Sequence, residues 1–276
     1  MKKKYMIPGM AGIVILAIII GFSLLAPILA PVSPEAIDMS QSLKPPSGEH
    51  LFGTDVLGRD MFSRILYGGR SSMMLALAAT VGSMAFGMAV GTLAGYYGGI
   101  LDETVMVCLN IFQGLPGTSL MIAVAGIMGP SFKSLMIALI LTSWTGFARI
   151  VRTEVMKLKT ENFIEGLKCL GAGDMTIIWK HMIPNMKGNT IVLFTTRIGR
   201  CILSISGLSF LGLGVQPPAP DWSVMISDAR MNFRSAPHLI LVPGICMVLL
   251  LFGINLIGDM LRDMFDKKEG EAGGYE

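Results

Sequence analysis

The sequence predicts an all-α, polytopic membrane protein with six transmembrane helices. Hydrophobic residues make up 52% of the 276-residue chain and charged residues only 15%, whereas a soluble domain usually carries about a quarter charged residues. The apolar residues gather into long uncharged stretches, and six of these reach the roughly 20 residues that a helix needs to cross a bilayer. The alternating ten-residue segments of a transmembrane barrel are absent from the sequence. These observations exclude an ordinary soluble enzyme or binding domain.

The six predicted spans follow one another along the chain. Backbone groups inside lipid must be hydrogen-bonded within their own segment, so each window is expected to be helical. The windows cover approximately residues 8–30, 72–96, 103–128, 132–150, 190–215 and 239–261.

The first window follows a basic start at residues 2–4, as in a secretory signal. Its apolar run is longer than the about 7–15 residues of a signal peptide. We therefore predict an uncleaved anchor helix within residues 1–31, followed by an extracytoplasmic or interfacial segment at 32–71.

Glycines distinguish the second and third windows. In the second, they recur every four or five positions, a spacing that lets a neighbouring helix approach closely. The third is interrupted by Gly114-Leu115-Pro116-Gly117, and such a break is tolerated only where it faces protein or a water-filled cavity. We expect it to line a transport pathway. The glycines of the second window are Gly82, Gly87, Gly91 and Gly95.

Lysine and arginine in the connecting segments predict the orientation, because cytoplasmic loops carry an excess of both. Residues 2–4 place the N-terminus in the cytoplasm, and six crossings return the tail, residues 267–276, to the same side. The connection at 151–188 then also lies inside, and it is rich in lysine and arginine. We predict a multi-pass protein of the cell membrane with both termini cytoplasmic.

One basic segment disagrees with this orientation. Arg59, Arg64 and Arg70 would lie outside, with Asp55 and Asp60 offsetting part of their charge. We expect an amphipathic elbow along the membrane interface.

The connection at 151–188 predicts short helices on the membrane face. The first of its helices opens at 153–159, and a run of apolar residues at helical spacing then leads to Gly171, which ends that helix. Asp174 is placed to cap the next helix, 175–182, and Pro184 is expected to end it. The spaced apolar residues are Phe163, Ile164, Leu167 and Leu170.

The same connection resembles the EAA loop of binding-protein-dependent ABC import permeases. The resemblance lies in residues 165–171 and 181–185, where Glu165, Gly171 and Pro184 match the family pattern. Gly166 and Leu167 stand where the family has alanines. The resemblance implies that this loop docks on an ATPase subunit and transmits its closure. The residues assigned to coupling are Glu165, Gly166, Leu167, Gly171, His181 and Pro184.

Three further segments look like the C-type permeases of the dipeptide/oligopeptide/nickel family: residues 51–68, 208–218 and 255–263. The resemblance implies the type I ABC importer (MetI-like) permease fold for residues 72–266. It also implies a homologous second permease subunit, two ATP-binding subunits and an extracytoplasmic substrate-binding protein as partners. Short peptides and a nickel chelate both remain open as cargo.

No enzymatic machinery is predicted on this chain. It lacks the GxxxxGK[ST] loop that cradles nucleotide phosphates, so ATP and magnesium are expected on the partner subunits. The cysteines and histidines stand singly, without metal-ligand spacing. We predict no catalytic residue, no metal site, no cofactor and no nucleic-acid partner.

Two groups of charged residues are further candidates. Arg197 and Arg200 lie three positions apart in the fifth window, hence on one helix face. Arginine inside a membrane is costly and usually faces a cavity, so the pair is a candidate pathway lining; snorkelling toward the surface is the alternative. In the connection before the sixth window, Asp221, Asp228 and Arg230 are candidate contacts for the substrate-binding protein, with an ordinary solvated loop as the alternative.

A second class of function is a secondary carrier, or an exporter subunit that uses no binding protein. A carrier predicts internal repeats and carboxylates within the membrane. The second to sixth windows show no obvious repeat, and acidic residues occur only near their edges. The importer permease is therefore favoured.

Overall fold

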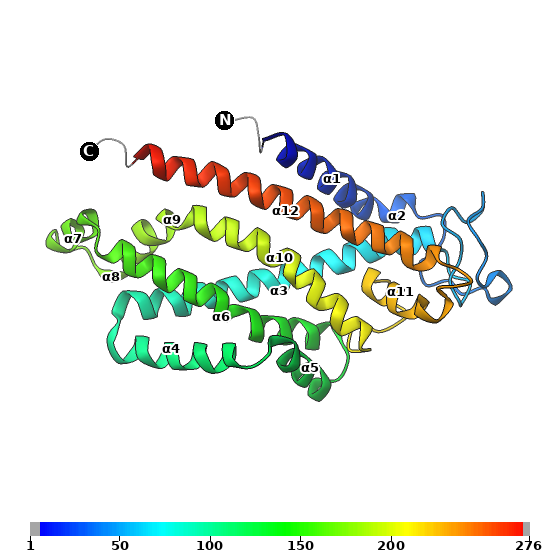
Figure 1. Cartoon of the computed structure of the whole chain (residues 1–276), viewed down its shortest axis with the longest axis horizontal. Coiled ribbons are helices and arrows are strands. Elements are labelled where there is room, and N and C mark those ends of the chain that lie inside the picture. Colours follow the sequence, from blue (N-terminus) through cyan, green and yellow to red (C-terminus); the bar gives the residue numbers. More distant parts are fainter. Residues whose placement is uncertain (1–5, 273–276) are drawn as a thin grey trace.

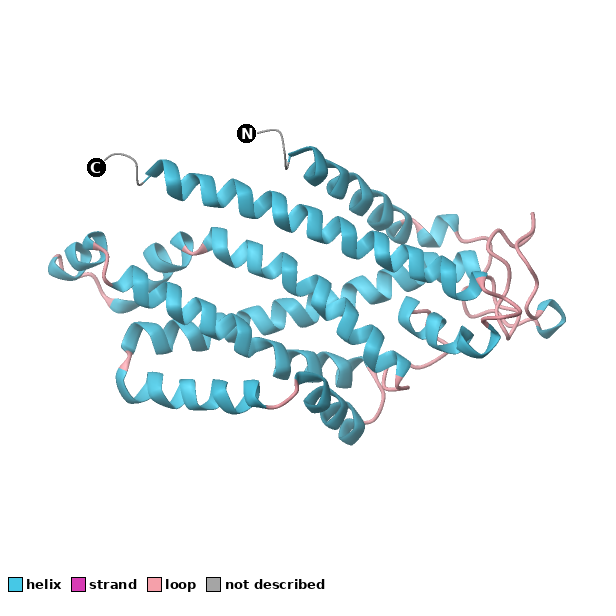
Figure 2. Cartoon of the chain, viewed as in Figure 1, coloured by secondary structure: helices cyan, strands magenta, loops and turns pink. Residues whose placement is uncertain are grey.

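The computed structural model describes residues 6–272 and is built from helices (Figures 1 and 2). Within that range the only β contact is an isolated antiparallel bridge between Thr54 and Asp60. The predicted all-α fold is confirmed. The long helices are α1 (Met6–Leu24), α3 (Met61–Tyr97), α6 (Phe132–Lys159), α10 (Lys187–Phe210) and α12 (His238–Ala272).

Shorter helices connect and flank these spans. Two 3₁₀ turns, Met39–Gln41 and Arg230–Asn232, and one π-helical segment, Ile177–Met182, complete the set. The short α-helices are α2 (Ala26–Leu29), α4 (Gly99–Gly114), α5 (Gly117–Met128), α7 (Asn162–Cys169), α8 (Asp174–Thr176), α9 (Ile183–Asn185) and α11 (Trp222–Ala229).

Among the described residues, five helices are individually long and apolar enough to cross a membrane. The sixth predicted span is the pair α4 and α5, which is bent by 87° where the chain breaks. The break falls at Leu115 and Pro116, inside the interruption that the sequence predicts. Proline has no N–H to donate and disfavours a helical residue before it, which accounts for the bend. Counted as one broken span, the pair gives six.

The second span begins earlier than predicted. Helix α3 starts at Met61 rather than near residue 72, because the Asp60 carboxylate accepts a hydrogen bond from the Ser63 amide at 2.8 Å and caps it. Of the three arginines placed in the predicted interfacial elbow, Arg59 and Arg64 are buried in the protein and Arg70 is exposed.

Glycines set the packing of α3 against α6, the most extensive helix contact in the fold. A Cβ on Gly87 would stand 2.5 Å from the Cβ of Phe147, and one on Gly91 would collide with the backbone of Ala148. A Cβ on Gly95 would stand 2.8 Å from the Arg152 carbonyl oxygen. The two backbones therefore touch along three turns, as the glycine spacing predicts.

The two ends of the bundle differ (Figures 1 and 2). The start of α1, the end of α12 and helices α7 to α9 lie toward one end, here called the α7 end. Helix α11 and the long connection through residues 30–60 lie at the other, the α11 end. Helix α12 includes most of the predicted tail 267–276, of which residues 273–276 lie outside the described range, as do the basic residues 2–4.

Alanine at Gly91 tests the close approach. Alanine normally stabilises a helix relative to glycine by about 0.5–1 kcal/mol, but here the added methyl meets backbone that cannot rotate away. Gly91→Ala should destabilise the protein by about 1–3 kcal/mol, measured as a lower melting temperature of the detergent-purified protein.

Gly126→Ala is the matched control, because nothing lies within 4 Å of a Cβ at that position in α5. It should leave the melting temperature unchanged or raise it. Equal effects at the two positions would contradict the proposed contact.

Candidate functional site

The segment α7 to α9 carries the residues that resemble a coupling loop, and it is anchored by its own small core. Ile164, Ile177 and Met182 are each 0% exposed. They pack with Val151 and Val155 from the end of α6. Helical spacing of apolar residues predicts this buried face, and Leu167 also packs against it.

The end of α7 has the geometry of a Schellman motif. Gly171 has φ of +78°, its N–H donates to the Lys168 carbonyl at 2.9 Å, and the Ala172 N–H donates to Leu167 at 3.0 Å. The prediction that Gly171 ends the helix is confirmed. Gly166 is exposed with nothing within 4 Å of a Cβ, so replacing the family's alanine there changes no contact within the chain.

Three details of this segment were predicted wrongly. Residues 153–159 continue α6 without a break. Asp174 does not cap α8, whose N-cap is Gly173; its carboxylate instead accepts a hydrogen bond from the Tyr96 hydroxyl at 2.7 Å. Pro184 does not stop the helical run either, because it occupies the first turn of α9, where no N–H is needed.

Tyr96 fixes the segment to the membrane bundle, a role that sequence reasoning missed. It lies near the end of α3, it is 4% exposed, and the ammonium groups of Lys159 and Lys168 lie 5.9 and 5.6 Å from its ring centroid. An aromatic residue at the end of an apolar span was the available signal.

The outer face of the segment is apolar and exposed. Phe163, Leu170, Met175 and Trp179 are 43%, 85%, 63% and 65% exposed. Glu165 of the same segment is exposed and lines an open cleft with Lys168. Large exposed apolar side chains on a short segment that also carries exposed charges indicate an interaction surface. We call these four residues the α7 patch.

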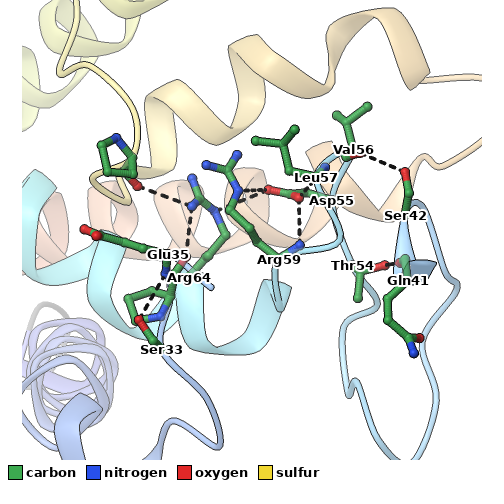
Figure 3. Close-up of polar contacts among 12 residues, drawn as sticks. Ser33, Glu35, Gln41, Ser42, Thr54, Asp55, Val56, Leu57, Arg59 and Arg64 are labelled. Atoms are coloured by element: carbon green, nitrogen blue, oxygen red, sulfur yellow. Dashed lines mark hydrogen bonds and ion pairs between the residues drawn. The ribbon is translucent and has the colours of Figure 1, made fainter. Parts of the chain in front are cut away.

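At the α11 end, two buried arginines converge on one carboxylate (Figure 3). The Arg59 Nε donates to Asp55 at 2.6 Å, and the Arg64 Nε lies 3.6 Å from the same oxygen. Arg64 is 1% exposed, and its Nη1 donates to the carbonyls of Pro34 at 3.0 Å and Pro218 at 3.5 Å.

This network ties together segments that are distant in sequence: residue 34, the connection at 55–59, the start of α3 and the turn before α11. It also borders a cavity of about 280 Å³, which Asp228 of α11 lines. Partial desolvation beside this cavity raises the pKa of the Asp228 carboxyl, while Arg59 and Arg64 act against that rise. The two arginines therefore form a structural brace at this end of the bundle.

The structure separates the three candidate contacts at this end. Asp221 is 0% exposed, caps α11 through the amides of Ser223 and Val224, and accepts a hydrogen bond from the Ser72 hydroxyl at 2.7 Å. Its predicted role as a surface contact is wrong, because its carboxylate is buried and hydrogen-bonded inside the fold. Asp228 and Arg230 are exposed.

Arg197 and Arg200 open onto a cavity of about 160 Å³ between α3, α5, α6 and α10. Gly117, the first residue of α5 after the break, also lines it. The Arg197 guanidinium carbon lies 5.8 Å from the centroid of the Phe147 ring. Both arginines therefore line a cavity between the helices, with Arg197 half-buried and Arg200 exposed, as the pathway hypothesis requires.

The comparisons with known proteins agree with this arrangement. The sequence profile of the family "binding-protein-dependent transport system inner membrane component" matches residues 87–270. The chain belongs to this family. A second profile, "N-terminal TM domain of oligopeptide transport permease C", matches residues 8–46. The chain is therefore a permease subunit of a binding-protein-dependent ABC importer, and a secondary carrier or exporter is set aside.

Relatives of this permease match it over nearly their full length. The dipeptide transport system permease protein DppC of Alkalihalophilus pseudofirmus is 39% identical over 260 residues, covering 94% of this chain and 86% of that protein. The glutathione transport system permease protein GsiD of Pectobacterium atrosepticum is 38% identical over 259 residues, covering 94% and 86%. GsiD of Escherichia coli O6:K15:H31 is 39% identical, covering 97% and 88%.

Among solved structures, the inward-facing MetNI methionine ABC transporter shares the fold. Its matching chain has a TM-score of 0.60 at 18% identity, covering 72% of this permease and 95% of that chain. The predicted MetI-like fold is confirmed.

Removing the shared carboxylate tests the brace at the α11 end. Asp55→Asn leaves two buried arginines without their anion, and breaking a buried pair in this way costs about 3–5 kcal/mol. The melting temperature of the purified permease should fall by several degrees. Glu49→Gln, an exposed carboxylate in the same connection, is the control and should leave it unchanged. A small, equal shift for both variants would refute the brace.

Proposed function

We propose that this permease carries short peptides into the cell and that the α7 to α9 segment is its contact with the ATPase subunits. The names of the relatives support the cargo: they are dipeptide and glutathione permeases, and glutathione is itself a tripeptide. A nickel chelate, the other cargo that the sequence left open, has no such support among them.

The α7 end is proposed to be cytoplasmic, together with both termini. The start of α1 and the end of α12 lie toward this end (Figure 1). Basic side chains are also concentrated there, as expected for a cytoplasmic face. They are Lys157, Lys159, Lys168, Lys180 and Lys187.

The observation that carries the coupling proposal is the α7 patch on a firmly anchored segment. A surface held by a buried core and by Tyr96 moves as one piece when a partner pulls on it. The α7 to α9 segment is connected to α6 by Thr160 and Glu161, and to α10 by Met186 alone. A displacement of this segment is therefore passed to α6 and α10.

Those two helices also line the cavity that contains Arg197 and Arg200, with Ser143 and Phe147 on α6 and Ser204 on α10. Closure of an ATPase dimer on the α7 patch would in this way reshape the space through which a peptide passes. This is an alternating-access mechanism in which the ATP and magnesium remain on the partner subunits.

The α11 end is then extracytoplasmic and would receive the substrate-binding protein. Asp228 and Arg230 are the exposed charges left as candidate contacts there. A homologous second permease would complete the pathway, with two ATP-binding subunits below it.

A charge placed in the α7 patch tests the coupling proposal. Leu170→Asp puts a carboxylate on the most exposed apolar side chain of the segment, where burying it against a partner is costly. We expect at least about tenfold less ATPase subunit to co-purify with the tagged permease.

Asn162→Asp is the control: it adds the same charge to the same helix, but in the first turn, where the helix dipole favours it. Membrane insertion of both variants is checked by their yield and elution profile. Normal co-purification and uptake with Leu170→Asp would overturn the proposal.

A further inference from the structure

We propose that the cavity between α3, α5, α6 and α10 binds the carboxylate of a peptide in transit, through Arg197 and Arg200. The inference rests on the proposed peptide cargo and adds a specific chemical group and a place where it is held. Peptides with a free carboxyl terminus share this anion whatever their side chains are.

The two arginines supply positive charge that no described carboxylate neutralises. Among the side chains of residues 6–265, no carboxylate lies within ion-pair distance of either guanidinium. Arg197 is half-buried and rests on the Phe147 ring. An uncompensated cation inside a membrane protein is costly and marks a functional site. A guanidinium is also the side chain best shaped to hold a carboxylate, because it offers paired donors in one plane.

The walls also add neutral donors. Ser143 on α6 and Ser204 on the same helix as the arginines line the cavity, and neither hydroxyl is hydrogen-bonded among the described residues. Other hydroxyls on the walls behave differently: that of Thr80, for example, donates to its own helix at 2.7 Å. Two free hydroxyls beside two guanidiniums form a lining suited to an anion.

The break between α4 and α5 contributes backbone donors. The first bond inside α5 runs from Leu120 to the Pro116 carbonyl at 3.1 Å. The amides of Gly117, Thr118 and Ser119 thus have no partner within the helix. Gly117 lines the cavity, so the positive end of this half-helix adds to the field of the arginines. Supplying these amide donors to the cavity is a functional reason for the break in this span.

Gly146 makes room for Arg197. A Cβ at this position of α6 would overlap the guanidinium and stand 2.7 Å from its central carbon. Gly146 is therefore a positioning residue, since any side chain there would push the guanidinium out of its present place.

The test measures binding to the assembled complex of permeases and ATPases, without the substrate-binding protein. The probes are N-acetyl-dialanine and its carboxyl-terminal amide, which differ only in the anion. The unmodified complex should bind the acid at least about tenfold more tightly than the amide. Arg197→Gln and Arg200→Gln should each abolish this preference, and Arg197→Lys should keep part of it.

Two further variants isolate the geometry. Arg262→Gln, an exposed arginine on α12 that does not line the cavity, is the matched control and should retain the preference. Gly146→Ala should weaken binding of the acid, yet have no further effect in an Arg197→Gln background, because its action passes through that guanidinium.

Equal binding of acid and amide, binding of neither, or a preference that survives both glutamine variants would each overturn the inference. So would loss of the second permease from the Arg197→Gln complex, because the arginine would then pair with an acid of that subunit. ATP-driven peptide uptake by the unmodified complex, measured in parallel, tests the proposed function separately.

Discussion

The contact between α3 and α6 is the constraint on which the other features depend. Lipid tails are as apolar as the side chains themselves, so the hydrophobic effect does not drive helices together in a membrane. Helices there associate through close packing instead. At Gly87, Gly91 and Gly95 the backbones of the two helices lie against each other. The glycines place no side chain between them that could change its conformation to relieve a clash. Helix α6 is thus held firmly along its length. Because it lines the arginine cavity and continues toward α7, it joins the two proposed working parts of the permease.

The two ends of the bundle are held together by different forces. At the α11 end, Asp55 and two buried arginines link the connections to the start of α3 through charge and hydrogen bonds. At the α7 end, a small apolar core and Tyr96 serve the same purpose while the outer face stays exposed. A network of charged hydrogen bonds fixes the relative positions of the segments that it joins, as a rigid support for this end of the bundle requires. An exposed apolar patch on a rigid segment suits docking to another protein.

Much of this arrangement follows from local sequence. Hydropathy places the six spans, and helical spacing with Gly171 places α7, because each depends on residues close together in the chain. The start of α3 could not be placed in this way. Arg64 looks like a surface charge until Pro34, Asp55 and Pro218 are brought around it, and those partners lie up to 154 residues away.

The same limit explains the errors in the candidate sites. Asp221 has the appearance of a loop charge, but its burial is created by Ser72 on another helix. Asp174 and Pro184 fit the usual signals for a cap and a stop. Asp174 instead bonds to Tyr96 of another helix, and Pro184 lies in the first turn of α9, where proline is tolerated. Arg197 and Arg200 were placed on one face correctly. The start of α5, which lines their cavity, and Gly146, which makes room for Arg197, could be brought to them only by the fold.

The central claim is that the α7 end meets the ATPases while the α11 end meets the substrate-binding protein. Site-directed photo-crosslinking tests it most directly, after the exposed Cys108 and Cys169 are replaced by serine. A benzophenone attached at Leu170→Cys should give an adduct with an ATPase subunit, and one attached at Met231→Cys, where the native side chain is 86% exposed, an adduct with the binding protein. Exchange of the two products, or an ATPase adduct from position 231, would contradict the account.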